Sequence, residues 1–123
     1  MSVQFDIVGQ EWPADADGYR EPPAAMFVNI ANANAQDFLR WARFPDTRLY
    51  GQLPARELAA LLRRRLWPEH RTKDDDGIPA SVDHAPGTPI IVNFGREPGR
   101  LTRYAERLLA LAEFAGDRTI HWY

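Results

Sequence analysis

The sequence predicts an α+β fold in which a four-stranded mixed sheet carries about three helices, packed mostly on one face. Short apolar or alternating stretches separated by turn-forming residues predict the strands. Longer stretches with apolar residues at helical spacing predict the helices. Together they give the order β-β-α-α-β-α-β. A chain of 123 residues is long enough to bury a core, so we assign residues 1–123 to a single domain.

Two strands and a helix are expected in the first third of the chain. Residues 3–8 alternate between apolar and polar side chains, which predicts a half-buried strand. Residues 26–31 are largely apolar on both faces, a pattern typical of a strand in the interior of a sheet. A helix should follow at once. Asn34 is a good N-cap, and Asp37 three residues later completes a pattern like a capping box.

The middle of the chain predicts a second helix and a long loop. Pro54 suits the first turn of a helix, and Pro68 would end it. Leucines at helical spacing form its expected buried stripe: Leu58, Leu61, Leu62 and Leu66. Residues 68–89 are rich in proline, aspartate and glycine and poor in large apolar groups, so we predict a flexible loop there.

The last third predicts a strand, the longest helix and a final strand. Residues 90–94 form a short apolar run that reads as a second buried strand. The helix that follows has one apolar face: Leu101, Tyr104, Ala105, Leu108, Leu111, Ala112 and Ala115. Gly116 is a natural residue to end that helix, and residues 119–123 form the final strand.

Composition narrows the classes of function. Without cysteine the chain has no disulfide framework, zinc–thiolate site or thiol nucleophile. A net charge of −2 argues against a nucleic-acid binder. No stretch reads as a signal peptide or as long enough to span a bilayer. We therefore expect a cytoplasmic protein that has no membrane contact and no cofactor.

Three parts of the chain resemble a widespread group of small bacterial proteins. These parts are the repeated-asparagine turn in 28–35, the Tyr-Gly-Gln-Leu-Pro-Ala stretch in 50–55, and the Gly-Arg-Glu-Pro-Gly-Arg-Leu entry to the last helix in 95–101. The resemblance covers the chain outside its two long loops. It implies a bacterial protein of uncharacterised function and transfers no catalytic residue.

The best candidate for a ligand site is a pair of strand-to-helix turns. If the strands ending at 31 and 94 are parallel neighbours, their turns would bring together Asn32, Asn34, Arg96 and Arg100. Arginines and two helix N-termini would attract an anion. In the alternative interpretation, the asparagines only cap the helix and the arginines only pair with Glu97 and solvent.

Other groupings are weaker. The histidines and aspartates of 68–89 lack the regular spacing of a metal site, and Ser81, Asp83 and His84 lack the context of a hydrolytic triad. The arginines of the second helix could form a phosphate patch, although a solvated helix end explains them as well: Arg56, Arg63, Arg64 and Arg65.

No catalytic grouping is identified, so we expect binding rather than catalysis. The leading hypothesis is a small non-enzymatic protein that engages another protein, with Trp67 and Trp122 as candidate interface residues. The alternative is a protein or enzyme that binds a small anionic, phosphorylated ligand at the asparagine and arginine turns.

Overall fold

The computed structural model describes residues 1–10, 26–77, 79–83, 86–87, 90–93, 95 and 97–123 of the chain. Within them the elements are β1 (Ser2–Ile7), β2 (Val28–Ala31), α1 (Asn32–Trp41), β3 (Gly51–Pro54), α2 (Ala55–Arg65), β4 (Ser81–Asp83), β5 (Ile91–Asn93), α3 (Arg100–Ala115) and β6 (Thr119–Trp122). The α+β fold class and the order of the predicted elements are confirmed, with β3 and β4 as additional short strands.

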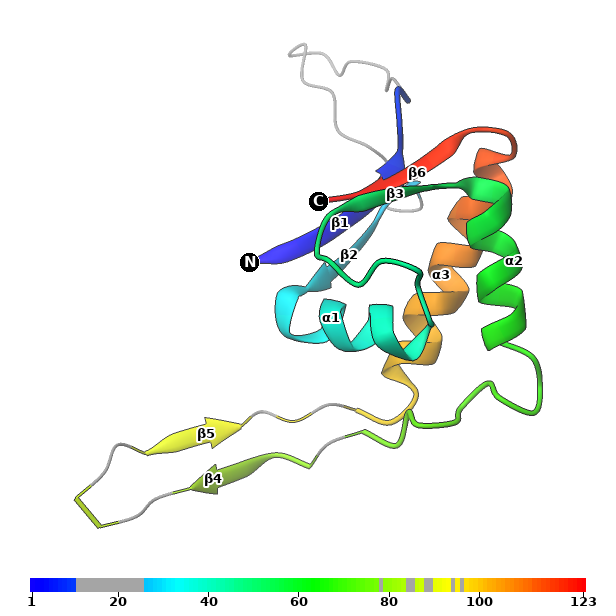
Figure 1. Ribbon diagram of the computed structural model, residues 1–123. Helices are drawn as coiled ribbons and strands as arrows, with labels where there is room; N and C mark the ends of the chain where they lie inside the picture. The colour runs from blue at the N-terminus through cyan, green and yellow to red at the C-terminus, as the bar shows by residue number, and fades with distance from the viewer. Residues whose placement is uncertain (11–25, 78, 84–85, 88–89, 94, 96) are drawn as a thin grey trace, which may run out of the picture.

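The main sheet has four strands in the order β2-β1-β6-β3, and α1, α2 and α3 all lie on one of its faces (Figure 1). Every neighbouring pair is antiparallel, so the expectation of a mixed sheet is wrong in this detail. The physical reason lies in β5. It pairs with β4 in a separate two-stranded sheet, so it does not form a parallel β-α-β unit with β6. Gly51–Pro54, expected to be part of a connector and a helix start, supplies the fourth strand.

The core lies between the sheet and the helices. The predicted inward face of β1 is confirmed, because Val3, Phe5 and Ile7 are all buried. The predicted apolar face of α3 is buried along its whole length. Aromatic rings join the layers. Phe5 of β1 stacks on Trp122 of β6 with centroids 5.7 Å apart and meets Phe38 of α1 edge-on at 6.2 Å.

Trp122 belongs to this core, so its expected role in an exposed interface is wrong. Only 2% of it is exposed, because β6 is a central strand and Trp122 lies on its helix-facing side. The indole N–H donates to the carbonyl oxygen of Arg48 at 3.0 Å, which satisfies the buried donor. Gly51 makes room for the ring, since a Cβ there would lie 2.6 Å from Cζ2 of Trp122.

The strand at 28–31 is an edge strand, not an interior one. Its Val28 and Ile30 are buried, whereas Asn29 and Ala31 are exposed. A one-sided antiparallel sheet requires apolar residues only at alternate positions. The sequence pattern suggested two buried faces because Phe27 and Ala31 are apolar and short strands give little periodicity.

The first helix begins at Asn32, two residues before the predicted start. Ala31 is its N-cap residue, and no side chain caps it. The Asn32 N–H donates instead to the Met1 carbonyl oxygen at 3.1 Å, which continues the pairing of β1 with β2. The pairing of β1 with β2 therefore satisfies the N–H of the first helical residue, whereas the predicted N-cap, Asn34, lies inside the helix.

Candidate functional site

A cleft of about 910 Å³ lies beside the C-terminal turn of α1 and the outer face of α2. Its remaining walls come from residues 70–74 and from the start of α3. The residues that line it are Asp37, Arg40, Trp41, Ala42, Arg43, Glu57, Ala60, Leu61, Arg64, Arg65, His70, Lys73, Asp74 and Leu101. The volume falls in the range typical of ligand-binding sites.

Part of the cleft surface is apolar. Leu61 is half-buried and Ala60 is exposed, whereas the leucines on the core face of α2, Leu58 and Leu62, are completely buried. Trp41, a residue that is 9% exposed, adds an aromatic side chain. The predicted leucine stripe of α2 thus extends beyond the leucines that are buried in the core. Leu61, at the edge of the stripe, lines the cleft.

The charged groups of the cleft are mainly cationic. Five arginine and lysine side chains line it against three carboxylates, a surplus of two positive charges in a chain whose net charge is −2. Among the described residues, five arginines elsewhere form ion pairs with carboxylates: Arg48, Arg56, Arg63, Arg71 and Arg103. Within the same residues, Arg40, Arg43 and Arg64 have no carboxylate within ion-pair distance. Three arginines that have no carboxylate partner in the described part of the chain therefore line this cleft.

Arg65 fixes one wall of the cleft. It is buried, and its guanidinium group lies 3.8 Å from the centre of the Trp41 ring. It donates to the carbonyl oxygen of Trp41 at 2.8 Å and to those of His70 and Lys73. Burial lowers the pKa of Arg65, and Asp74 opposes that shift. The side chain thus ties the end of α1 to the segment 66–75, which we call the strap.

Two further contacts hold the strap. The Trp41 indole N–H donates to the Lys73 carbonyl oxygen at 2.8 Å. At the far end, the buried carboxylate of Asp75 accepts from the N–H groups of Leu101 and Thr102 at 3.2 and 2.9 Å. Residues 68–75 of the strap are the first part of the predicted loop 68–89. The strap is anchored by polar contacts at both ends, although the flexibility of the whole loop stays a prediction.

Asp75 also changes the predicted anion site. Its carboxylate lies 25 residues before the start of α3 in the sequence and accepts hydrogen bonds from N–H groups in the first turn of that helix. These are the N–H groups that were expected to bind an anion. The strands that precede the two turns are not parallel neighbours, since β2 pairs with β1 and β5 pairs with β4. The basis for bringing Asn32 and Asn34 beside Arg100 is therefore wrong.

Three of the four predicted ligand residues, Asn32, Asn34 and Arg100, lie among the described residues. Arg96 lies outside the described residues. Arg100 donates to the Tyr104 hydroxyl at 2.7 Å. It lines a shallow hollow of about 550 Å³ whose other residues are Asn29, Glu97, Arg103, Tyr104 and Arg107. Asn32 and Asn34 are half-buried at the start of α1, and neither lines this hollow or the cleft. Sequence reasoning missed the site that contains Arg40, Arg43 and Lys73. The spacing of the two arginines was a weak signal, because Arg43 lies in the turn after α1 and not on the helix.

The other candidate interface residue, Trp67, is 60% exposed at the start of the strap. Exposure of the large apolar tryptophan side chain to water is unfavourable, and tryptophan is enriched at protein–protein interfaces. The interface role of Trp67 stays a prediction.

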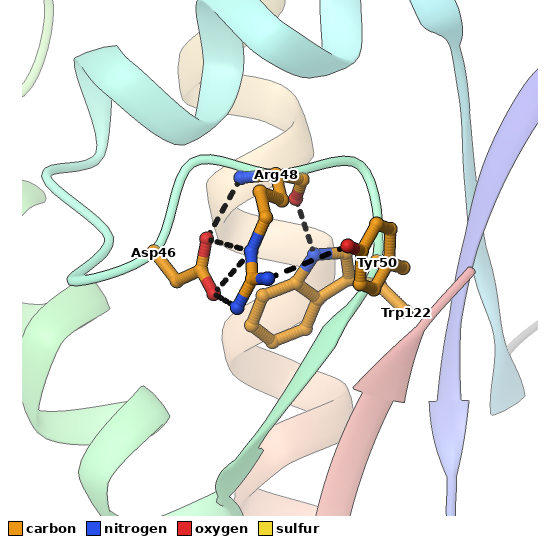
Figure 2. A network of polar contacts seen from close by, with 4 residues as sticks. All are labelled: Asp46, Arg48, Tyr50 and Trp122. Carbon is orange, nitrogen blue, oxygen red and sulfur yellow. Dashed lines mark hydrogen bonds and ion pairs between the residues drawn. The ribbon is translucent and has the colours of Figure 1, made fainter.

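The connector between α1 and β3 is held by its own polar network (Figure 2). The Asp46 carboxylate receives two N–H groups of Arg48, with Nη2 at 2.6 Å from Oδ2. This contact lowers the pKa of Asp46 and raises that of Arg48. Arg48 also lies over the Tyr50 ring at 5.1 Å, and its carbonyl accepts from Trp122. The charges of Asp46 and Arg48 are thus paired with each other. The hydrogen bond from Trp122 to the Arg48 carbonyl oxygen holds the connector against the core.

A second polar cluster joins β1 to the C-terminal residues. Asp6 Oδ2 accepts from the Tyr123 hydroxyl at 2.7 Å and from the Gln4 amide at 2.9 Å, while Asp6 Oδ1 pairs with His121. The hydrogen bond to Asp6 raises the pKa of Tyr123 to about 12, with a further contribution from burial. Each group is engaged by another member of the cluster, which favours a structural role.

The Tyr123 phenol should titrate near pH 12, above the usual tyrosine pKa of about 10. A pKa that is higher in the folded state means that the folded protein holds this proton more tightly. The resulting stabilisation is complete below about pH 10 and is lost as the pH rises through 12. Ultraviolet titration of wild type and Tyr123→Phe should assign the highest phenolate step to Tyr123. Titration of every tyrosine near pH 10 would contradict the contact with Asp6.

Within the described residues, no helix is long and apolar enough to cross a membrane. Comparison with protein-family models, with curated proteins and with solved structures finds no match. The cleft is therefore interpreted from its own chemistry.

Proposed function

We propose that this chain is a small non-enzymatic binding protein that engages another protein, and that an anionic segment of the partner occupies the basic cleft. The observation that carries the proposal is the gathering of Arg40, Arg43 and Arg64, which have no carboxylate partner among the described residues, around a partly apolar hollow. Arginine suits this task because its planar group donates two parallel hydrogen bonds to a carboxylate. The proposal places the protein in the cytoplasm and requires no cofactor.

A small phosphorylated molecule is the second candidate ligand. The same arginines would bind its phosphate oxygens, and the cleft volume of about 910 Å³ suits such a ligand. The three carboxylates in the cleft, Asp37, Glu57 and Asp74, oppose a compact ligand of high charge. A segment of a partner protein can place single carboxylates beside the arginines and away from the carboxylates of the cleft. We therefore prefer a protein partner.

Two neighbouring arginines of α2 provide a matched test. Arg64 lines the cleft, whereas Arg63 pairs with Glu113 of α3 outside it. We expect Arg64→Gln to weaken binding of a short glutamate-rich peptide about tenfold, the equivalent of about 1.4 kcal/mol, because a charge-assisted contact is lost. Arg63→Gln should leave the affinity within about twofold, since exposed ion pairs contribute little.

The peptide affinities would be measured by calorimetry at low and at high salt, with inorganic pyrophosphate as a parallel probe. Binding should weaken with salt, because the cleft is open to solvent. Pyrophosphate that binds tightly and depends on Arg64, with no peptide binding, would support the second candidate and refute the first. Equal losses in the two arginine variants would refute the cleft as the site.

A further inference from the structure

We infer that the cleft recognises a bipartite motif, in which an apolar side chain of the partner is flanked by carboxylates. The apolar side chain would pack on Leu61, Ala60 and the edge of Trp41, while the carboxylates would bind Arg40, Arg43 and Arg64. This inference rests on the proposed function and specifies the chemistry of the partner segment.

The apolar requirement comes from the surface that α2 leaves open. Leu61 is only partly buried although it packs against the core, and Ala60 beside it is exposed. A purely ionic ligand would leave this surface in water. Covering it with one aliphatic side chain would contribute more to affinity than an exposed ion pair does. The apolar contact should therefore decide affinity within a set of equally charged ligands.

The charge requirement comes from the cations around that surface. Arg40 and Arg43 come from the end of α1 and the turn after it, and Arg64 comes from the last turn of α2. They therefore approach the apolar surface from two helices, which fits carboxylates on both sides of an apolar anchor.

The cleft is also preformed on the side of the strap. Arg65, Trp41 and Asp75 tie the strap to α1 and α3 through hydrogen bonds that are internal to the chain. A wall fixed in this way loses little conformational entropy when a ligand binds. A short peptide is therefore a suitable probe.

The test uses two peptides of equal charge: one with a leucine between two pairs of glutamates, and one with serine in place of that leucine. We expect the leucine peptide to bind wild type at least about fivefold more tightly, the equivalent of about 1 kcal/mol. The protein variant Leu61→Ala should lose most of this preference. Leu109→Ala is the matched control, because Leu109 is also partly buried against the core but lies on α3 outside the cleft.

The outcomes separate the two levels of the argument. If both peptides bind equally and both depend on Arg64, the proposed function stands and the bipartite motif is refuted. If neither peptide binds folded wild type, the proposed function itself is refuted. A preference for leucine that survives Leu61→Ala but not Leu109→Ala would also overturn the inference, since it would place the anchor elsewhere. Thermal melts of both leucine variants establish that each is folded.

Discussion

Replacing Asp75 with alanine should lower the free energy of unfolding by about 2–4 kcal/mol, because two buried N–H groups of α3 would lose their acceptor. The carboxylate receives the N–H groups of Leu101 and Thr102, and it lies 2.8 Å from the Thr102 hydroxyl. The Asp75 carbonyl oxygen accepts a further N–H, from Gly99, at 2.9 Å. Negative charge at a helix N-terminus adds to the hydrogen bonds through the helix dipole.

Asp76→Ala is the control, since Asp76 is the exposed neighbour of Asp75. Asp75→Asn should show an intermediate loss, because the amide keeps one acceptor oxygen but removes the charge. Chemical denaturation of the three variants measures these differences. A loss below about 0.5 kcal/mol for Asp75→Ala would show that this carboxylate does not cap the helix.

Strong periodicity made most of the fold predictable. The alternation in β1 and the seven apolar positions of α3 give the direction of the core correctly. These elements are long enough for their patterns to distinguish a buried face from an exposed one. Fold class follows from the order of such elements, so a one-layer sheet covered by helices could be predicted without any relative.

Short strands were harder to place in the sheet. β3 and β5 have four and three residues, too few for a period to identify the partner strand. The edge position of β2 was missed because its apolar composition resembles that of an interior strand. Whether the sheet is antiparallel throughout depends on which strands are neighbours. The apolar pattern of a single strand does not identify its neighbours.

The candidate site was less predictable than the fold. Its wall depends on contacts between residues far apart in sequence, such as the 26 positions between Asp75 and Leu101 or the 32 between Trp41 and Lys73. The sequence indicates the arginines of α2 as a candidate patch, but its pattern does not distinguish Arg65 from Arg64. Arg65 is buried and bonded to carbonyl groups, whereas Arg64 is exposed in the cleft. Burial alone divides these neighbours into a structural and a candidate binding residue.

The second large effect is expected for Arg65→Met, which should lower the free energy of unfolding by about 2–4 kcal/mol. Methionine keeps much of the aliphatic stem, so the loss reports mainly on the guanidinium group. That group satisfies the carbonyl oxygens of Trp41, His70 and Lys73 and lies over the Trp41 ring. Without it, the Trp41 carbonyl oxygen must find water at the base of the cleft or remain unpaired. The carbonyl oxygens of His70 and Lys73 would each keep one donor, and the cation–π contact would disappear.

Arg65→Lys distinguishes charge from geometry. Lysine keeps the positive charge, but its single ammonium group cannot replace a planar fork that reaches three carbonyl groups. We therefore expect it to recover less than half of the stability lost in Arg65→Met. Arg64→Met is the matched control and should change the free energy of unfolding by less than about 0.5 kcal/mol, because Arg64 is exposed and has no ion-pair partner among the described residues. Full recovery by lysine would show that charge, and not the hydrogen bonds of Arg65, holds the strap against α1.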